Sequence, residues 1–420
     1  MKLKETNKFL FNIVVVTGTI VLALLIYFAF FLHAKVSVEV EPENAVVTLD
    51  NAPIKVEGGK AETRAMLGKH MLKVESDDYI GYKEEITLAR GKNYSKKITL
   101  KTAPMPIEIA ASAQFIAVKN NEIFYQNPSD KLIYLSKIKF SAGGEIQPES
   151  TQAITSSAIE NVDNILWSPT RELLLLKRGT DVNLFDFKKY DFVNQQEALF
   201  GHYIGDIVWS PDNSRVAYYY APPSGEKSLI FSDAANKDIF RAANLKNLNI
   251  NNPYIAFSPD SQWLVIIPRN QNFEENKIFL MNVFTKEVKE INSTGNQKEA
   301  IFSSDNQKII YSTFSSNPNN LIHRDLSVMN LNGSEKKSLG VSAKASDVRY
   351  WNNPNKVFLL RTTENSKLEL ADLLDNTLTD FFFKGQNQTN ISEIILSGNN
   401  SGAVFVSEDK LYYVKLVGND

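Results

Sequence analysis

The side chains best suited to acid–base or metal chemistry are four histidines, and their spacing does not assemble a site. His33, His70, His202 and His323 are far apart, and no pair stands at i, i+4 or in a His-Glu-x-x-His run. Metal ligands are usually grouped more closely than this along a chain. We therefore expect no histidine–metal site. We interpret His33 as lying at a membrane boundary, His70 in a turn, and His202 and His323 in loops.

Motifs for nucleophilic, phosphate-binding or calcium-binding chemistry are missing as well. The chain has no cysteine, which excludes thiolate catalysis and Cys-ligated zinc or iron–sulfur centres. It has no Gly-x-Ser-x-Gly elbow, no Walker loop, no Gly-x-Gly-x-x-Gly fingerprint and no Asp-x-Asp-x-Asp-Gly loop. The sequence therefore predicts no catalytic residue, no cofactor and no metal ligand. It leaves the ligand-binding residues unknown.

What the sequence does contain is a repeat, in which an apolar strand runs into an aromatic residue, a small polar residue and a tight turn. Its copies begin at 167, 209, 257, 302, 350 and, in worn form, 396, which places them 42 to 48 residues apart. That period is typical of a four-stranded propeller blade, because each blade must stack on its neighbours to bury its apolar faces. The copies are Trp167-Ser168-Pro169-Thr170, Trp209-Ser210-Pro211-Asp212, Phe257-Ser258-Pro259-Asp260, Phe302-Ser303-Ser304-Asp305, Tyr350-Trp351-Asn352-Asn353 and Leu396-Ser397-Gly398-Asn399-Asn400.

Folding alone explains the residues of this repeat. Pro and Asp favour a tight turn, Ser bonds nearby backbone groups, and the aromatic residue wedges between blades. The best-defined copy predicts an inner strand at 206–209, a second strand at 215–220 and a third at 228–232. We therefore assign the repeated Ser, Asp and Trp residues a structural role.

The number of blades follows from the two ends of the repeat region. Strands expected at 115–118, 122–125 and 131–135 supply a degenerate first blade and bring the total to seven, with six as the alternative. The final copy stops one strand short after 410–416. A segment such as Ile107–Ala110 could supply the missing strand and remove a free sheet edge.

The repeat region, residues 107–420, resembles TolB-like and WD-repeat-like β-propellers. The Trp-Asp ending and Gly-His opening of WD repeats are missing, which favours the TolB-like branch. The resemblance implies a rigid ring of blades that presents loops for recognition.

Residues 36–102 resemble the PEGA family of small extracytoplasmic β-sandwich domains. The resemblance rests on Pro42-Glu43-Asn44-Ala45, Gly68-Lys69-His70 and Gly81-Tyr82. Asn44 replaces the glycine of the name-giving tetrapeptide, and Asn also enters left-handed turn conformations. The resemblance implies a spacer near the cell surface. The two prolines at 103–106 predict a stiff linker between this unit and the propeller.

The N-terminus predicts a membrane anchor. Residues 9–32 are apolar apart from Asn12, Thr17, Gly18 and Thr19, and as a helix they would reach roughly 36 Å, enough to cross a bilayer core. Lysines at 2, 4 and 8 precede this stretch and acidic residues follow it, so the positive-inside rule leaves the tail, residues 1–8, in the cytoplasm. The bulk of the chain would then be extracytoplasmic.

Two alternatives to the anchor are a cleaved signal peptide and a buried core helix. A signal peptide has an apolar core of about 7 to 15 residues and a small-x-small cleavage site. Here the apolar stretch is longer, and Leu32 stands three residues before the only cut that small residues allow. The uncleaved anchor is therefore favoured.

Composition and loops together point to a binding or scaffolding protein and not to an enzyme. Lys and Arg (46) nearly balance Asp and Glu (48), so no basic field would attract nucleic acid. The expected partner is a protein, a peptide or an envelope glycan, bound by long loops on one propeller face near Tyr218–Tyr220. Those loops are expected at 221–227, 269–277, 314–325 and 361–366.

Two other functions stay open at this point. A glycan-processing propeller enzyme would place carboxylates at equivalent inner-strand positions of several blades, and only Asp206 and Glu393 suggest themselves. A purely structural envelope spacer would need no site at all.

Overall fold

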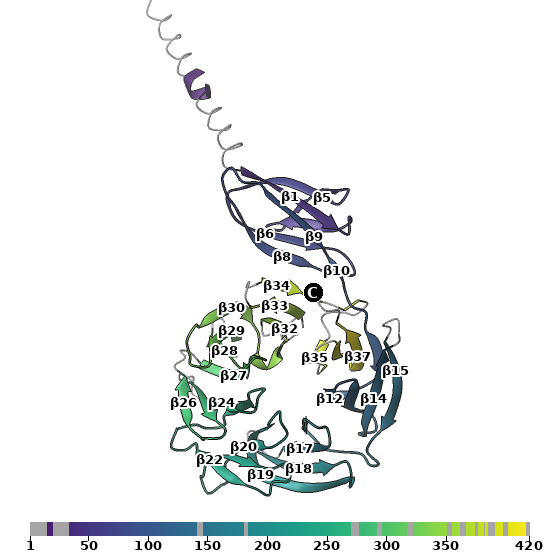
Figure 1. Cartoon of the computed structure of the whole chain (residues 1–420), viewed down its shortest axis with the longest axis vertical. Coiled ribbons are helices and arrows are strands. Elements are labelled where there is room, and N and C mark those ends of the chain that lie inside the picture. The colour runs from purple at the N-terminus through teal and green to yellow at the C-terminus, as the bar shows by residue number, and fades with distance from the viewer. Residues whose placement is uncertain are drawn as a thin grey trace, which may run out of the picture. The chain divides into compact units, whose positions relative to one another are not determined.

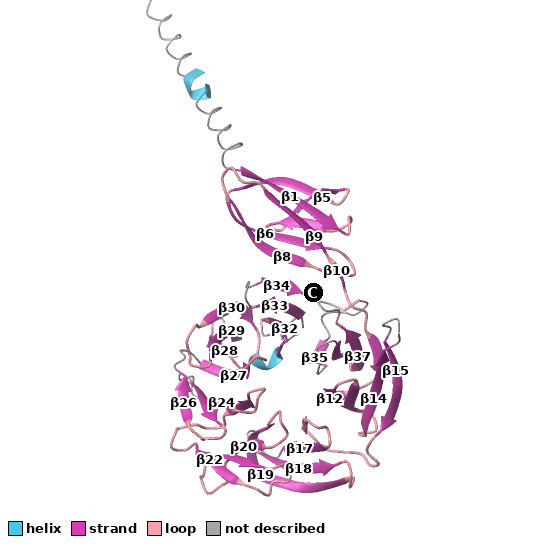
Figure 2. Ribbon diagram, viewed as in Figure 1, coloured by secondary structure: helices cyan, strands magenta, loops and turns pink. Residues whose placement is uncertain are grey.

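In a computed structural model, nearly all the regular secondary structure of the described residues is β-strand (Figure 2). The described residues are 15–19, 33–140, 146–179, 184–269, 277–291, 296–316, 322–350, 355–361, 367–373, 377–381, 383–384, 391–397 and 402–416. Within these ranges, no helix combines the length and the apolar character that a membrane crossing requires. The span predicted at 9–32 lies outside the described residues except for a helical stretch at 15–19, and it stays a prediction.

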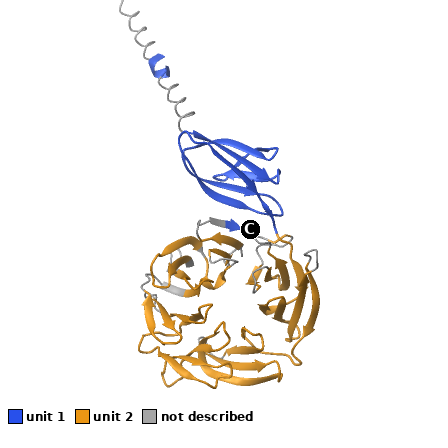
Figure 3. Ribbon diagram, viewed as in Figure 1, with its two compact units in different colours: residues 1–103, 377–381 blue, residues 104–376, 382–420 orange. Residues whose placement is uncertain are grey.

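The chain divides into two compact units (Figure 3). The first unit comprises residues 1–103 and the short segment 377–381. The second comprises residues 104–376 and 382–420.

The first unit contains two four-stranded sheets, with strand orders β4-β5-β1-β9 and β3-β2-β6-β8, and a short pair β10-β7. Strand β1 buries every second residue, as a strand with one face on a core should. Both sheets contribute to one apolar core. The strands are β1 (His33–Glu41), β2 (Val46–Leu49), β3 (Ala52–Ile54), β4 (Val56–Glu57), β5 (Lys60–Met66), β6 (Gly68–Glu75), β7 (Tyr79–Ile80), β8 (Tyr82–Leu88), β9 (Tyr94–Thr99) and β10 (Lys101–Thr102).

The second unit contains six antiparallel sheets that follow one another around a ring (Figure 1). The first strands of neighbouring sheets contact one another, as in the pairs β12 with β16, β19 with β23, β23 with β27 and β35 with β12. These strands therefore form the inner side of the ring.

The strands that follow residue 103 are β11 (Ile107–Ala110), β12 (Gln114–Lys119), β13 (Glu122–Gln126), β14 (Ile133–Phe140), β15 (Ile146–Ala153), β16 (Asn164–Trp167), β17 (Leu173–Gly179), β18 (Phe185–Asp191), β19 (Gln196–Trp209), β20 (Val216–Tyr220), β21 (Ser228–Ser232), β22 (Phe240–Asn244), β23 (Tyr254–Phe257), β24 (Trp263–Ile267), β25 (Ile278–Asn282), β26 (Val288–Ile291), β27 (Asn296–Phe302), β28 (Lys308–Ser316), β29 (Ile322–Asn330), β30 (Lys337–Ser342), β31 (Val348–Tyr350), β32 (Lys356–Arg361), β33 (Lys367–Asp372), β34 (Thr377–Asp380), β35 (Ile391–Leu396), β36 (Gly402–Ser407) and β37 (Lys410–Lys415), with a 3-10 helix η1 (Ala345–Asp347) before β31. All of these strands belong to the second unit except β34, whose residues group with the first.

One of the six sheets has seven strands because β19 serves two neighbouring groups. The first part of β19 pairs with β18, and its last part pairs with β20. The sheet order β16-β17-β18-β19-β20-β21-β22 is therefore two four-stranded groups that share one strand. With this sharing, the described strands that follow residue 103 form seven four-stranded groups.

The last sheet is completed by the first strand of the unit. Its order is β11-β37-β36-β35, and β11 pairs antiparallel with β37 from Ile107 against Tyr413 to Ala110 against Leu411. The sequence prediction that Ile107–Ala110 supplies the missing strand is confirmed. The pairing covers the edge that β37 would otherwise expose.

The repeated turns are held by their serines, which are buried. In each turn the serine hydroxyl accepts a hydrogen bond from the backbone N–H five residues later. In three of them it also donates to the aspartate two residues later, and that carboxylate accepts the N–H two residues beyond it. The structural role predicted for Ser and Asp is confirmed. The serines are Ser168, Ser210, Ser258, Ser303 and Ser397.

The predicted loops between second and third strands are only partly described. The loop at 221–227 is present as expected between β20 and β21. The loop predicted at 314–325 is shorter than expected, because β28 extends to Ser316 and β29 begins at Ile322. The ends of these strands are polar, so the hydrophobic pattern of the sequence indicated a loop where the hairpin continues. Most of the loops predicted at 269–277 and 361–366 lies outside the described residues.

Candidate functional site

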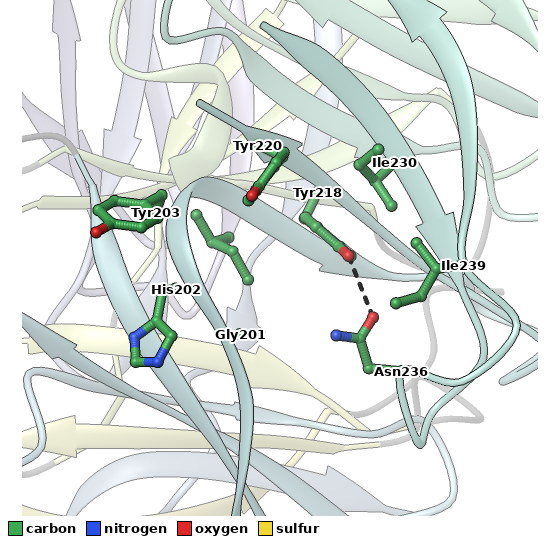
Figure 4. Close-up of a pocket in the computed structure, with 9 residues that line it drawn as sticks. Gly201, His202, Tyr203, Tyr218, Tyr220, Ile230, Asn236 and Ile239 are labelled. Carbon is green, nitrogen blue, oxygen red and sulfur yellow. Dashed lines mark hydrogen bonds between the residues drawn. The ribbon is translucent and has the colours of Figure 1, made fainter. Parts of the chain in front are cut away.

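A pocket of about 420 Å³ lies where β19 passes from one four-stranded group to the next (Figure 4). Its volume falls within the range of small-ligand pockets, roughly 300 to 1,000 Å³. Strands β19, β20 and β21 and the segment between β21 and β22 each contribute to its wall. The lining residues are Gly201, His202, Tyr203, Ile204, Tyr218, Tyr220, Ile230, Asn236 and Ile239.

A β-bulge in β19 shapes one side of this pocket. Phe187 pairs with Gly201 and Phe185 with Ile204, so His202 and Tyr203 together oppose a single residue of β18. Tyr203 has a φ of 56°, in the left-handed region that a bulky side chain rarely occupies. Bulges re-aim side chains and are frequent beside functional sites. Here the bulge places an aromatic ring that is 44% exposed at the pocket rim.

The inner wall of the pocket is apolar, and its polar atoms are paired. The Tyr218 hydroxyl donates to Oδ1 of Asn236 over 3.1 Å, as the dashed line in Figure 4 marks. Nδ2 of Asn236 donates to the carbonyl of Phe200 over 2.5 Å. Burial raises the pKa of Tyr218 to about 12, so its hydroxyl stays protonated and keeps donating at physiological pH.

The outer rim carries a hydrogen-bonded histidine–aspartate pair. Nδ1 of His202 lies 2.8 Å from Oδ1 of Asp186, and both side chains are partly exposed. This contact holds one ring nitrogen of His202 and leaves Nε2 on the open side of the rim. The pocket therefore has an apolar interior and a polar, aromatic rim.

A second cluster lies on the inner strands of the ring. Five inner strands carry a polar residue three positions before their last residue: Asn164, Asp206, Tyr254, Glu299 and Glu393. Asp347 stands at the same place before the end of β31, but it belongs to η1. A bulge precedes or contains this position in β19, β27 and β35. Asp206 and Glu393 were predicted at such positions, whereas Glu299 and Asp347 were missed. Counting back from the repeated turn in every copy would have found both.

Basic side chains from second strands and neighbouring inner strands complete this inner cluster. We define it as Lys177, Asp206, Tyr254, Arg269, Glu299, Arg349 and Glu393. The Arg269 guanidinium lies 5.2 Å from the centre of the Tyr254 ring, and Nζ of Lys177 lies 3.4 Å from the centre of the Phe185 ring.

The charges of the inner cluster perturb one another inside the ring. Loss of solvation raises the pKa of Asp206, and the charge of Arg269 partly opposes that rise. Loss of solvation also raises the pKa of Glu393, against the charge of Arg349. It lowers the pKa of Lys177, against Asp163 and Asp206. Groups with pKa values shifted in this way are frequent in functional sites, but structural networks produce the same shifts.

Hydrogen bonds give two of these carboxylates a structural task. Oδ2 of Asp206 accepts the backbone N–H of Ile255 over 3.0 Å, and Ile255 belongs to the next inner strand. Oε2 of Glu299 accepts the N–H and hydroxyl of Ser346 over 3.2 and 2.6 Å, just before the inner strand of its next sheet. The two carboxylates therefore tie successive sheets together.

The structure corrects the predicted settings of three histidines. His70 lies in β6 and not in a turn, and its side chain is 12% exposed. His202 lies in β19, beside the pocket, and His323 lies in β29, so neither is in a loop. Strands that continue through a bulge or a polar hairpin account for these errors. Within the described ranges, no three His, Asp, Glu or Cys side chains come together as metal ligands.

Comparisons with known proteins agree with the two resemblances found in the sequence. Residues 33–104 match the PEGA domain family, and this prediction is confirmed. A search of the curated proteins found no match.

Solved structures similar to this chain include TolB-like β-propeller proteins, as the sequence predicts. TolB from Acinetobacter baumannii is 13% identical, with 70% of this chain and 78% of that chain covered and a TM-score of 0.40. A putative TolB from Agrobacterium tumefaciens is 14% identical, with 66% and 95% covered and a TM-score of 0.39. Hydrazine synthase of Kuenenia stuttgartiensis is 9% identical, with 74% and 97% covered and a TM-score of 0.48. At this degree of similarity, these structures indicate no function for this chain.

Proposed function

We propose that this chain is a membrane-anchored, extracytoplasmic binding protein, in which a seven-bladed, TolB-like propeller holds a partner through the pocket beside Tyr203. The helix at 9–32 is the anchor, and the PEGA domain is a spacer between the anchor and the propeller. The partner is a protein, a peptide or an envelope glycan. Binding is non-covalent, and the chain has no catalytic role.

The pocket is the observation that carries this proposal. It combines a volume suited to a ligand group with an apolar interior and an exposed aromatic side chain, that of Tyr203. Tyr203 is held in a left-handed conformation that turn formation alone does not require of a tyrosine. Strained residues on a rigid sheet are where recognition is most precise.

The anchor rests on the sequence. Its apolar stretch is long enough to cross a bilayer, and the lysines before it set the orientation. The lack of a basic field keeps nucleic acid out of the set of partners.

The test is capture of a partner by the full-length, tagged chain from detergent-solubilised cells. Ile239→Arg places a charged side chain at the pocket wall, and Phe284→Arg makes the same change at an exposed residue that does not line the pocket. We expect one partner to be retained by the parent chain and by Phe284→Arg, and to be lost with Ile239→Arg. Equal retention by both variants would rule out the pocket as the binding site.

A second candidate function is an enzyme that acts on envelope glycans, and the inner cluster is the observation that favours it. Asp206 and Glu393 have raised pKa values and lie on the inner side of the ring. Glycoside hydrolysis uses two carboxyl groups, one of them protonated at neutral pH. Release of reducing ends from envelope polysaccharide by the parent chain, but not by Glu393→Gln, would support this candidate in place of the binding protein.

A further inference from the structure

We infer that the pocket beside Tyr203 receives an apolar or aromatic side chain of an extended polypeptide segment, whose backbone is held by the rim. This inference rests on the proposed binding function and names the chemistry of the partner. It is supported by the kinds of polar groups that line the pocket and by the hydrogen bonds that they already make.

The interior offers contact without hydrogen bonds. Ile204, Ile230 and Ile239 supply aliphatic walls. In Figure 4 the side chain of Tyr218 lies near Ile230 and Ile239. Such walls gain from burying an apolar group, at about 25 cal/mol for each Å² removed from water. A hydroxyl group buried against them would lose its hydrogen bonds to water without gaining a partner, which costs free energy.

The one side-chain amide in the interior, that of Asn236, already makes two hydrogen bonds within the protein. Asn236 accepts from the Tyr218 hydroxyl and donates to the carbonyl of Phe200. A sugar ring carries several hydroxyl groups, and each needs a partner when it is buried. The residues that line this pocket include no second side-chain amide and no carboxylate, so a glycan is the poorer fit.

The rim has the groups that a peptide backbone needs. The hydroxyls of Tyr203 and Tyr220 and Nε2 of His202 can each donate or accept, according to protonation and rotation. Backbone N–H and C=O groups alternate along an extended segment and can use both kinds of partner. Exposed tyrosines of this kind are enriched where proteins bind one another.

Apolar surface around the pocket extends the contact beyond a single side chain. Ile239 is 51% exposed and Tyr203 is 44% exposed, and Leu199 on the same strand as Tyr203 is 58% exposed. An apolar patch of this kind beside a pocket marks a recognition surface more often than a solvated one. A polypeptide can cover the patch and fill the pocket together.

Selection from a displayed library of random peptides tests this inference, with the full-length chain in detergent as bait. We expect enriched peptides to share one apolar or aromatic position. Replacing that position by alanine should weaken binding at least about tenfold, as loss of an anchor does. Ile239→Arg should weaken the same peptides by a similar factor, while Phe284→Arg should leave binding unchanged. Thermal unfolding curves of both variants check that the fold is intact.

Three outcomes would overturn the inference. The library could yield no enriched peptide, the enriched peptides could bind Ile239→Arg as well as the parent chain, or envelope polysaccharide could bind in a pocket-dependent way when peptides do not. In the last case the proposed binding function stands and only the class of partner is wrong. If neither peptides, cell proteins nor glycans depend on Ile239, the proposed function fails as well.

Discussion

His70 in β6 makes two contacts that fix its protonation state. One ring nitrogen lies 2.6 Å from Oδ2 of Asp50 and the other lies 2.6 Å from the carbonyl of Met66. Because both partners only accept hydrogen bonds, the ring donates from both nitrogens and is an imidazolium. Burial alone would lower the pKa of His70, but the bonds to Asp50 and Met66 outweigh it and raise the pKa.

This contact predicts a pH-dependent stability of the PEGA domain. The folded pKa of His70 is above its unfolded value of about 6.5, so its contribution is complete below that pH and is lost as the pH rises through the folded pKa. We expect His70→Gln to lower the melting temperature clearly at pH 5.5 and only slightly at pH 9. Thermal unfolding across that range measures it, and an equal loss at both pH values would contradict the imidazolium.

Ser258 represents the buried serines of the repeated turns. Its hydroxyl accepts the N–H of Trp263 and donates to Asp260, so Ser258→Ala leaves both groups without that partner. We expect a loss of about 1–3 kcal/mol in the free energy of unfolding. Denaturant unfolding measures it against Ser224→Ala, an exposed loop serine whose loss should be near zero. A Ser258→Ala variant as stable as its control would show that the turn forms without the hydroxyl.

For individual residues, the sequence predicted the roles of those in the repeated turns but not of those that line the pocket. The role of Ser258 could be predicted because Ser, Pro and Asp act through local backbone bonds, which depend only on neighbours in the sequence. The pocket could not be predicted, since it depends on the two residues that bulge opposite one residue of β18. Tyr218 was predicted to lie near the binding face, but its bond to Asn236 depends on the course of the segment between β21 and β22.

At the scale of elements, β11 is the strand whose place is most informative. It lies at the beginning of the second unit and completes the sheet formed by its end. Ile109 packs against the core that both ends of the unit share. The missing fourth strand of the last copy made this pairing predictable, because a sheet with a free edge would be exposed.

A substitution in β11 should therefore destabilise the whole second unit. Ile109→Asp places a charge against an apolar core, and we expect a loss of at least about 2 kcal/mol. Glu108→Gln on the same strand removes only an exposed ion pair with Lys410, which should cost under about 1 kcal/mol. Denaturant unfolding followed by tryptophan fluorescence compares them. Equal stability of the two variants would mean that β11 is not needed to hold the last sheet.

Some elements escaped prediction for an identifiable reason. The hairpin of β28 and β29 continues through polar residues, so hydrophobic pattern suggested a loop at 314–325. The strand β19 runs for 14 residues through three register shifts, and it was expected as a short inner strand at 206–209. The lengths of this hairpin and of β19 both depend on pairing between strands, which cannot be seen in a single sequence.

At the scale of the whole molecule, the membrane anchor is the first point to test. We expect the chain to remain in the membrane fraction after a wash at high pH, since a spanning helix resists extraction. Protease added outside the cells should digest the propeller while leaving a tag on residues 1–8 intact, as the positive-inside rule requires. Release of the chain by the wash would contradict the anchor, and digestion of the tag would contradict its orientation.

The central claim is that a partner lies against the pocket of the propeller in the cell. A photo-reactive phenylalanine analogue at Tyr203, at Ile239 or at the exposed Phe284, which does not line the pocket, tests it directly in the full-length chain. We expect the same cross-linked product from positions 203 and 239 and no cross-linked product from position 284. No product from the two pocket positions, or the same product from all three, would contradict it.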